Sequence, residues 1–109
     1  MKIFISYTMK DNEISIAFLN NIKEKYQNFV NIYIDKLCDL SSQDSVLNEL
    51  STSDIVLLLN TQNIFNSKWV KLELDYAKSL GIPIIKYNPS YIINKKPEEL
   101  LDEINNFKL

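Results

Sequence analysis

One carboxylate occupies a position where a helix is otherwise apolar. Residues 66–80 have helical periodicity, and at about 100° per residue Glu73 falls among the apolar side chains, while Asp75 and the lysines fall on the opposite side. Trp69 precedes Glu73 by one helical turn. An ionised carboxylate in an apolar setting is costly unless it is protonated, paired, or lines a cleft where it acts on a ligand. Glu73 is therefore the first candidate for chemistry that needs a single acidic group.

The composition excludes several other kinds of site. The chain has no histidine, a single cysteine (Cys38) and a single glycine (Gly81). Histidine-based catalytic triads, the usual zinc sites, cysteine–histidine pairs and an internal disulfide are thereby excluded. A P-loop or a dinucleotide-binding glycine loop cannot be built, because each needs several positions without a side chain. We therefore expect no metal and no bound cofactor.

The length and composition of the chain are typical of one globular domain. Its 109 residues are 46% hydrophobic and 24% charged, with a formal net charge of -2, so we expect a single domain over residues 1–109. Lysines are scattered among acidic residues, which predicts neither nucleic acid nor a membrane as a partner. The apolar runs are strand-sized and the first residues lack a signal-peptide pattern, so the expected location is cytoplasmic.

Strand and helix patterns alternate along the chain. Unbroken apolar runs are typical of strands covered on both faces, whereas alternating polar and apolar residues indicate an edge strand. Strands are expected at residues 2–6, 30–35 (the alternating one), 54–60 and 82–85, with residues 90–94 as a candidate fifth strand. Helices are expected over residues 11–28, 43–51 and 67–80, with a last helix after Pro97. Asp11 is the expected N-cap of the first helix and Ser42 that of the second, and Gly81 is expected to end the third.

This alternation predicts a flavodoxin-like three-layer α/β sandwich with right-handed crossovers. We expect a parallel sheet of four strands in the order 2-1-3-4, or of five strands if residues 90–94 add one at the end. Ligands of such sheets bind at the carboxyl ends of the strands, where the strand order reverses. Ser6, Asp35 and Asn60 end the first three expected strands and Tyr7 follows the first, so these residues are candidates for substrate binding.

Three stretches of the chain form a recognisable pattern. They are IFISY at residues 3–7, IYID at residues 32–35 with the later residues 47–50 and the run SDIVLLL at 53–59, and SKWVKLE at 67–73 with GIPII at 81–85. Together they resemble a Toll/interleukin-1 receptor (TIR) domain of the prokaryotic kind. The chain departs from the family in two places. Residues 36–42 lack the glycine or proline often found in the family's loop there, and the chain is short after residue 86.

The resemblance implies an enzyme that consumes NAD+. In family members that cleave NAD+, the glutamate one turn after a tryptophan is catalytic, and that position corresponds to Glu73. The implied activity is hydrolysis or cyclisation of NAD+ at the nicotinamide N-glycosidic bond in antiphage defence signalling, with self-association through contacts between TIR domains. Tyr7 and Trp69 would stack on substrate rings. Asp35 begins the loop that would close the site or contact a neighbouring copy.

A single carboxylate is sufficient for this reaction. Nicotinamide leaves as a neutral pyridine and needs no general acid, so the acidic group has only to face the positive charge that develops on the ribose. NAD+ would be the substrate rather than a cofactor.

Other functions stay open at this point. One is a non-catalytic TIR module that binds protein partners, and another is a nucleotide N-glycosidase or deoxyribosyltransferase-like enzyme with a comparable glutamate. Glu73 could also be structural, tied to a backbone N–H or to a lysine, and Ser6 could satisfy neighbouring backbone groups. A phosphoacceptor receiver domain is excluded, because Ser6, Tyr7 and Asn60 stand where that fold needs acidic residues.

Overall fold

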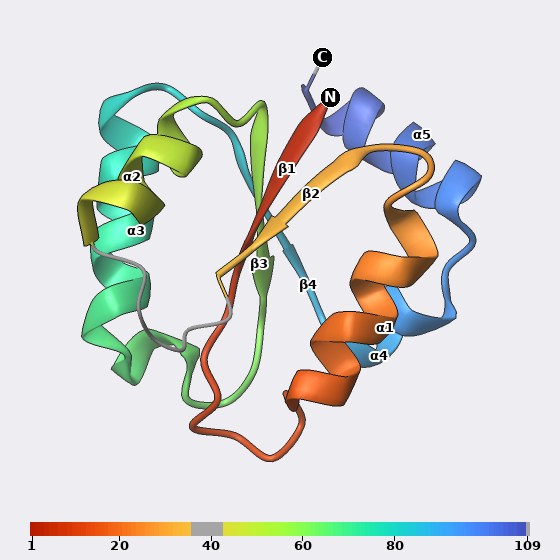
Figure 1. Cartoon of the computed structure of the whole chain (residues 1–109), viewed down its shortest axis with the longest axis horizontal. Helices are drawn as coiled ribbons and strands as arrows, with labels where there is room; N and C mark the ends of the chain where they lie inside the picture. The colour runs from red at the N-terminus through yellow and green to blue at the C-terminus, as the bar shows by residue number, and fades with distance from the viewer. Residues whose placement is uncertain (36–42, 109) are drawn as a thin grey trace.

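Four parallel strands form one sheet in the order β2-β1-β3-β4 (Figure 1). The computed structural model describes residues 1–35 and 43–108. The strands are β1 (Lys2–Ser6), β2 (Asn31–Ile34), β3 (Ile55–Leu59) and β4 (Ile84–Tyr87). The predicted α/β class, the parallel sheet and the strand order are confirmed.

Helices cover both faces of this sheet and complete the three layers (Figure 1). One face carries α1 (Ile16–Tyr26), α4 (Pro89–Asn94) and α5 (Pro97–Lys108). The other face carries α2 (Gln43–Ser51), the short 3-10 helix η1 (Ile64–Asn66) and α3 (Lys68–Ser79).

The two-residue period of the strands divides the core between the two faces. In β3, Ile55, Leu57 and Leu59 pack in the cluster beneath α1, α4 and α5. Val56 and Leu58 pack in the cluster beneath α2 and α3. Every residue of β3 is buried, as expected for a central strand of a parallel sheet with both faces covered.

The same period sets the direction of the last side chain of β1. Phe4 belongs to the cluster beneath α2 and α3, so Ser6, two residues later, faces the same layer. Ser6 pairs in register with Leu58 of β3, one residue before β3 ends. The carboxyl ends of the two central strands therefore lie together at one edge of the sheet.

The expectation of a fifth strand at residues 90–94 is wrong, because these residues belong to α4. Pro89 occupies the first turn of α4, where its fixed φ suits a helix and its missing N–H is not needed. The buried Tyr26 hydroxyl donates to the carbonyl oxygens of Ile92 (2.8 Å) and Lys95 (3.0 Å). Short apolar runs suit a strand or a buried helical turn equally well, and this tertiary contact favours the helix.

The predicted start of the first helix is also wrong. Helix α1 begins at Ile16 with Ser15 as its N-cap, and the Ser15 side chain accepts from the Phe18 N–H at 3.1 Å. Asp11, the expected cap, instead accepts from the backbone N–H of Asn63 at 2.8 Å and from its side-chain amide at 2.6 Å. Ser42, the other expected cap, lies outside the described residues. The predicted end of α3 is confirmed, since Gly81 follows it with a φ of 74°.

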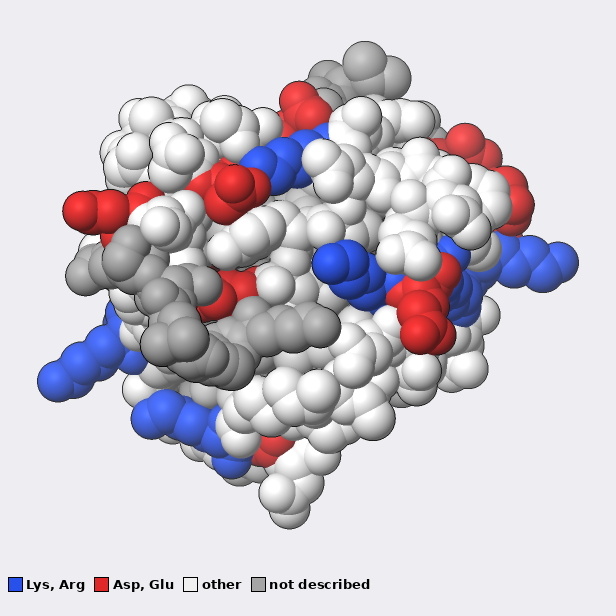
Figure 2. All heavy atoms as spheres, in the orientation of Figure 1, with Lys and Arg blue, Asp and Glu red and all other residues white. Residues whose placement is uncertain are grey.

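The surface carries mixed charges. Figure 2 shows acidic and basic side chains interspersed over one face, without a broad area of either sign. No helix in the described part of the chain is both long enough and apolar enough to cross a membrane.

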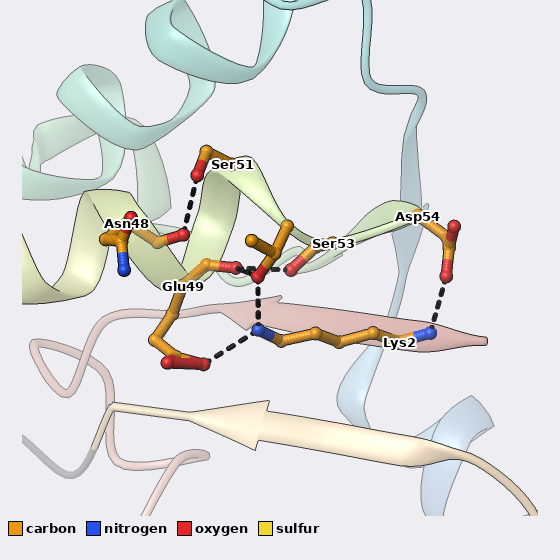
Figure 3. A network of polar contacts seen from close by, with 7 residues as sticks. Lys2, Asn48, Glu49, Ser51, Ser53 and Asp54 are labelled. Atoms are coloured by element: carbon orange, nitrogen blue, oxygen red, sulfur yellow. Dashed lines mark hydrogen bonds and ion pairs between the residues drawn. The ribbon is translucent and has the colours of Figure 1, made fainter.

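Lys2 joins the start of β1 to the end of α2 (Figure 3). Its ammonium lies 2.7 Å from Glu49 Oε1 and donates to the Thr52 hydroxyl at 2.6 Å. Its backbone N–H donates to Asp54 Oδ2 at 2.7 Å, and the Asp54 N–H donates back to the Lys2 carbonyl at 2.9 Å. Because the Lys2 side chain is only 16% exposed, these contacts are more shielded than a typical surface ion pair.

We expect Lys2→Met to lower the free energy of unfolding by about 1 kcal/mol, because it keeps the apolar stem but removes the contacts of the ammonium. Urea unfolding of the variant and the parent measures the difference. Lys78→Met, on the exposed side of α3, is the matched control and is expected to change stability much less. Equal effects of the two substitutions would show that the Lys2 contacts contribute nothing beyond a surface lysine.

Candidate active site around Glu73

Helix α3 places Glu73 against the sheet. The helix begins after Ser67, whose side chain accepts from the Val70 N–H at 3.2 Å. From there the helical period puts Val70, Leu74 and Ala77 in the core, and Glu73 on the same face. The Glu73 side chain lies within this buried face, and the residue is only 3% exposed.

Ser6 holds the Glu73 carboxylate. The Ser6 hydroxyl at the end of β1 donates to Glu73 Oε1 at 2.8 Å, and Ser6 is itself fully buried. The Trp69 side chain, one turn earlier on α3, also favours the ionised form of Glu73 and so lowers its pKa. The carboxylate is thus fixed between the end of a central strand and its own helix.

Within the described residues, no lysine forms an ion pair with Glu73. Burial raises the pKa of Glu73 from 4.5 to about 8. The Ser6 hydrogen bond lowers this pKa, the nearby charge of Asp35 raises it, and the Trp69 side chain lowers it. Glu73 is therefore mostly protonated at neutral pH, and anything positively charged placed beside it would favour its ionisation.

Tyr7 and Asp35 complete this group of residues at the carboxyl ends of β1 and β2. The Tyr7 hydroxyl donates to the backbone carbonyl of Asp35. Burial, Asp35 and Glu73 all raise the pKa of Tyr7 above its ordinary value, so this phenol stays neutral. Asp35 is therefore near enough to Glu73 to raise the pKa of its carboxyl group, and Glu73 is near enough to Tyr7 to raise the pKa of its phenol.

Tyr33 belongs to the same surroundings but was not a predicted site residue. It lies on β2 with its ring stacked on Phe4, at a centroid distance of 5.3 Å. Burial, Asp35, Glu49 and Glu73 raise its pKa. The alternation of β2 contained the signal, since Tyr33 and Asp35 are two residues apart and therefore share a face.

The structure thus brings Ser6, Trp69 and Asp35 close to Glu73, while Tyr7 bonds to the Asp35 carbonyl and packs its ring against the core cluster on the opposite face of the sheet. Asn60, the sixth, is exposed and lines a different hollow with Glu13 and Phe18, on the side of the sheet covered by α1 and α4. In the part of the chain that the structure describes, no three histidine, cysteine, aspartate or glutamate side chains are arranged to hold a metal ion.

No model of a known protein family matches this chain, and no curated protein matches its sequence. The chemical interpretation of the site therefore rests on its residues and their geometry.

The raised pKa of Glu73 makes stability depend on pH in a defined direction. Between about pH 4.5 and 8 the folded protein retains a proton that the unfolded chain releases, so the free energy of unfolding falls as pH rises. The slope is at most about 1.4 kcal/mol per pH unit. Glu73→Gln should remove this slope, because an amide does not titrate and its oxygen still accepts from Ser6. We expect the variant to be more stable than the parent at pH 8.

Urea unfolding at several pH values between 5 and 8 tests this expectation, with the exposed Glu98→Gln as the matched control. The control should keep the slope of the parent. If Glu73→Gln and the parent change in parallel with pH, the Glu73 pKa is not raised in the folded protein.

Proposed function

We propose that this chain cleaves the nicotinamide N-glycosidic bond of NAD+ and that Glu73 is the catalytic residue, as its resemblance to TIR domains implies. The observation that carries the proposal is a carboxylate that is 3% exposed, hydrogen-bonded to Ser6 and without a cationic partner among the described residues. It lies where ligands bind in open α/β sheets, at the carboxyl end of a central strand.

The energetics of this position support a functional role. A buried acid that must give up its charge or its solvation costs stability, and an apolar residue would suit the core beneath α3 better. Residues that lower stability while creating a perturbed pKa are concentrated at functional sites. A ligand with a positive charge would supply the partner that the described residues lack.

NAD+ is such a ligand. Its nicotinamide ring carries a positive charge, so binding it next to Glu73 would lower the pKa of the carboxyl group and favour the anion. The bond between the ring nitrogen and ribose C1′ then breaks, the electron pair stays on the nitrogen, and nicotinamide leaves neutral. The positive charge moves to the ribose, where the Glu73 carboxylate stabilises it until water adds at C1′ and releases a proton. If an atom of the adenine attacks instead of water, the product is cyclic.

The neighbouring residues have separate roles in this proposal. Ser6 is a positioning residue, because its hydroxyl already donates to Glu73. Tyr7 and Trp69, both half-buried, provide flat apolar surfaces for the nicotinamide or adenine ring, and Asp35 adds negative charge near the cationic substrate. Since Glu73 is almost inaccessible, entry of the ribose requires one of these neighbouring side chains to rotate away. The role of Asn60 in binding this substrate stays a prediction.

The wider biological setting belongs to the same proposal. The resemblance implies a cytoplasmic protein that acts in antiphage defence and self-associates through TIR–TIR contacts. The activity should then rise more than in proportion to protein concentration, because assembly would complete or stabilise the site.

Incubating the purified chain with NAD+ should release nicotinamide, and Glu73→Gln should reduce the rate by at least about 100-fold, because it removes the charge that stabilises the transition state. Chromatography of nicotinamide and ADP-ribose products measures this, at increasing protein concentration and with macromolecular crowding. Glu98→Gln is the control for a surface glutamate and should retain the parent rate.

The same assay with nucleoside monophosphates separates the alternatives. Base release from monophosphates alone, lost in Glu73→Gln, would replace the proposal with a nucleotide N-glycosidase or deoxyribosyltransferase-like enzyme. No release from any substrate under assembling conditions would leave a non-catalytic interaction module.

The pH dependence of kcat/KM provides a second prediction. Because the reaction needs ionised Glu73, kcat/KM should rise with pH and level off above about 8, the pKa of the free enzyme. Ser6→Ala removes a hydrogen bond that lowers this pKa, so its profile should shift to higher pH. A merely structural Ser6 would lower stability without moving the profile, and circular dichroism would confirm that the variant is folded.

A further inference from the structure

Strand β4 forms one edge of the sheet, and its outer side has no neighbouring strand among the described residues (Figure 1). In the other edge strand, β2, the two isoleucines are each only 8% exposed. No residue of β4 is buried to that degree, since Lys86 is exposed and Ile84, Ile85 and Tyr87 are partly exposed. Residues 90–94, which could have added a fifth strand here, form α4 instead. The described chain therefore leaves this edge of the sheet open.

The ladder with β3 determines which backbone groups of β4 point outward. The Val56 N–H of β3 donates to the Pro83 carbonyl oxygen at 2.9 Å, and Val56 is in register with Ile84. Backbone groups of successive strand residues point to alternate sides, so the odd-numbered residues face β3, whereas Ile84 and Lys86 face away from it. Among the described residues, no hydrogen bond uses the backbone N–H or carbonyl of Ile84 or Lys86. The missing N–H of Pro83 is on the side of β3 and takes nothing from the open edge.

The outward groups are arranged symmetrically about Ile85. With a two-fold axis at this residue, an antiparallel second copy would place the backbone of Ile84 in each chain opposite that of Lys86 in the other. Each of these two pairs exchanges two hydrogen bonds, so every outward donor and acceptor of Ile84 and Lys86 is satisfied. The two Ile85 side chains would meet on the face covered by α1, α4 and α5, where Tyr87 would lie opposite Pro83.

The position of the Lys86 charge permits this pairing. A lysine on an edge strand commonly prevents pairing with another chain. Here the Lys86 ammonium lies 5.6 Å from the centre of the Phe65 ring, on the same face as Ile84. Phe65 belongs to η1, which follows the carboxyl end of β3, so this contact holds the ammonium away from Ile85. In an antiparallel pair the carboxyl ends point in opposite directions, and the two ammonium groups therefore lie apart.

We propose that the edge of β4 binds the same edge of a second copy, joining the two sheets into one across a two-fold axis. A second copy suits this edge because one strand supplies the donors, the acceptors and the apolar contacts in a self-complementary register. The interface is small, so we expect a weak dimer that forms between about 10 μM and 1 mM. This pairing follows from the sheet alone and does not rest on the function proposed for Glu73.

Sedimentation and amide hydrogen exchange of the full chain over this concentration range test the pairing. We expect a monomer–dimer equilibrium in which the N–H groups of Ile84 and Lys86 exchange at least about tenfold more slowly at the highest concentration. The Ile85 N–H faces β3 and should change much less. A monomer at 1 mM, or a dimer without slower exchange at Ile84 and Lys86, would overturn the proposal. Since NAD+ is absent from both measurements, their failure is distinct from a failure of the proposed function.

Two substitutions of the same exposed residue separate the backbone contact from the side chain. Lys86→Pro removes an outward N–H from each copy without removing a bond to β3, so it should weaken dimerisation at least about tenfold. Lys86→Met keeps the N–H and should dimerise at least as well as the parent. Circular dichroism confirms that both variants are folded, and equal dimerisation of the two would contradict the pairing.

A cysteine on the two-fold axis tests the register in a Cys38→Ser chain. Residues opposite each other in a non-hydrogen-bonded antiparallel pair have Cα atoms about 4.5 Å apart, which a disulfide can span. Ile85→Cys should therefore form a disulfide between copies on mild oxidation. Asn88→Cys is the exposed control and should remain reduced, because the pairing places it about 20 Å from its equivalent in the other copy. Equal cross-linking of the two variants, or none at Ile85→Cys, would overturn the register.

Discussion

The burial of one carboxylate against the end of β1 is the constraint on which the candidate site depends. Ser6 can reach Glu73 only because β1 is a central strand whose even-numbered side chains face α3, and because the Ser67 cap sets the rotation of that helix. The same burial that orients the carboxylate also raises its pKa to about 8. Position and reactivity therefore have a common cause, and any change that exposes Glu73 alters both.

The fold was predictable where the burial of a strand determines its pattern of polar and apolar residues. The unbroken apolar run of β3 and the alternation of β2 indicated which strand is central and which is at the edge, and the observed order agrees. The run at residues 90–94 was ambiguous, because its assignment depends on Tyr26, which is distant in sequence and bonds to the carbonyls of Ile92 and Lys95. Likewise, nothing local reveals that Asp11 bonds to Asn63 instead of capping α1.

The candidate site was predictable for a similar reason. Helical periodicity alone identified Glu73 as a charge on a buried face, and parallel topology alone brought the ends of β1 and β2 beside it. The hydrogen bond from Ser6 and the inclusion of Tyr33 required the actual direction of each side chain. The strand order predicted that Asn60 lies at the carboxyl edge of the sheet, but it did not predict on which face. A residue just after a strand can face either helix layer, and Asn60 lines the hollow beside α1 and α4.

The hydrogen bonds of the Tyr26 hydroxyl affect how this protein unfolds. It is buried on α1, and both of its acceptors belong to the segment formed by α4 and the residue that follows it. Detaching that segment would leave a phenol without partners in an apolar interior, which costs about 1–3 kcal/mol in addition to the lost packing of Ile92. The last helices are therefore thermodynamically tied to the first, and the amide hydrogens of α1 and α4 are expected to exchange with solvent in one shared opening rather than by separate fraying.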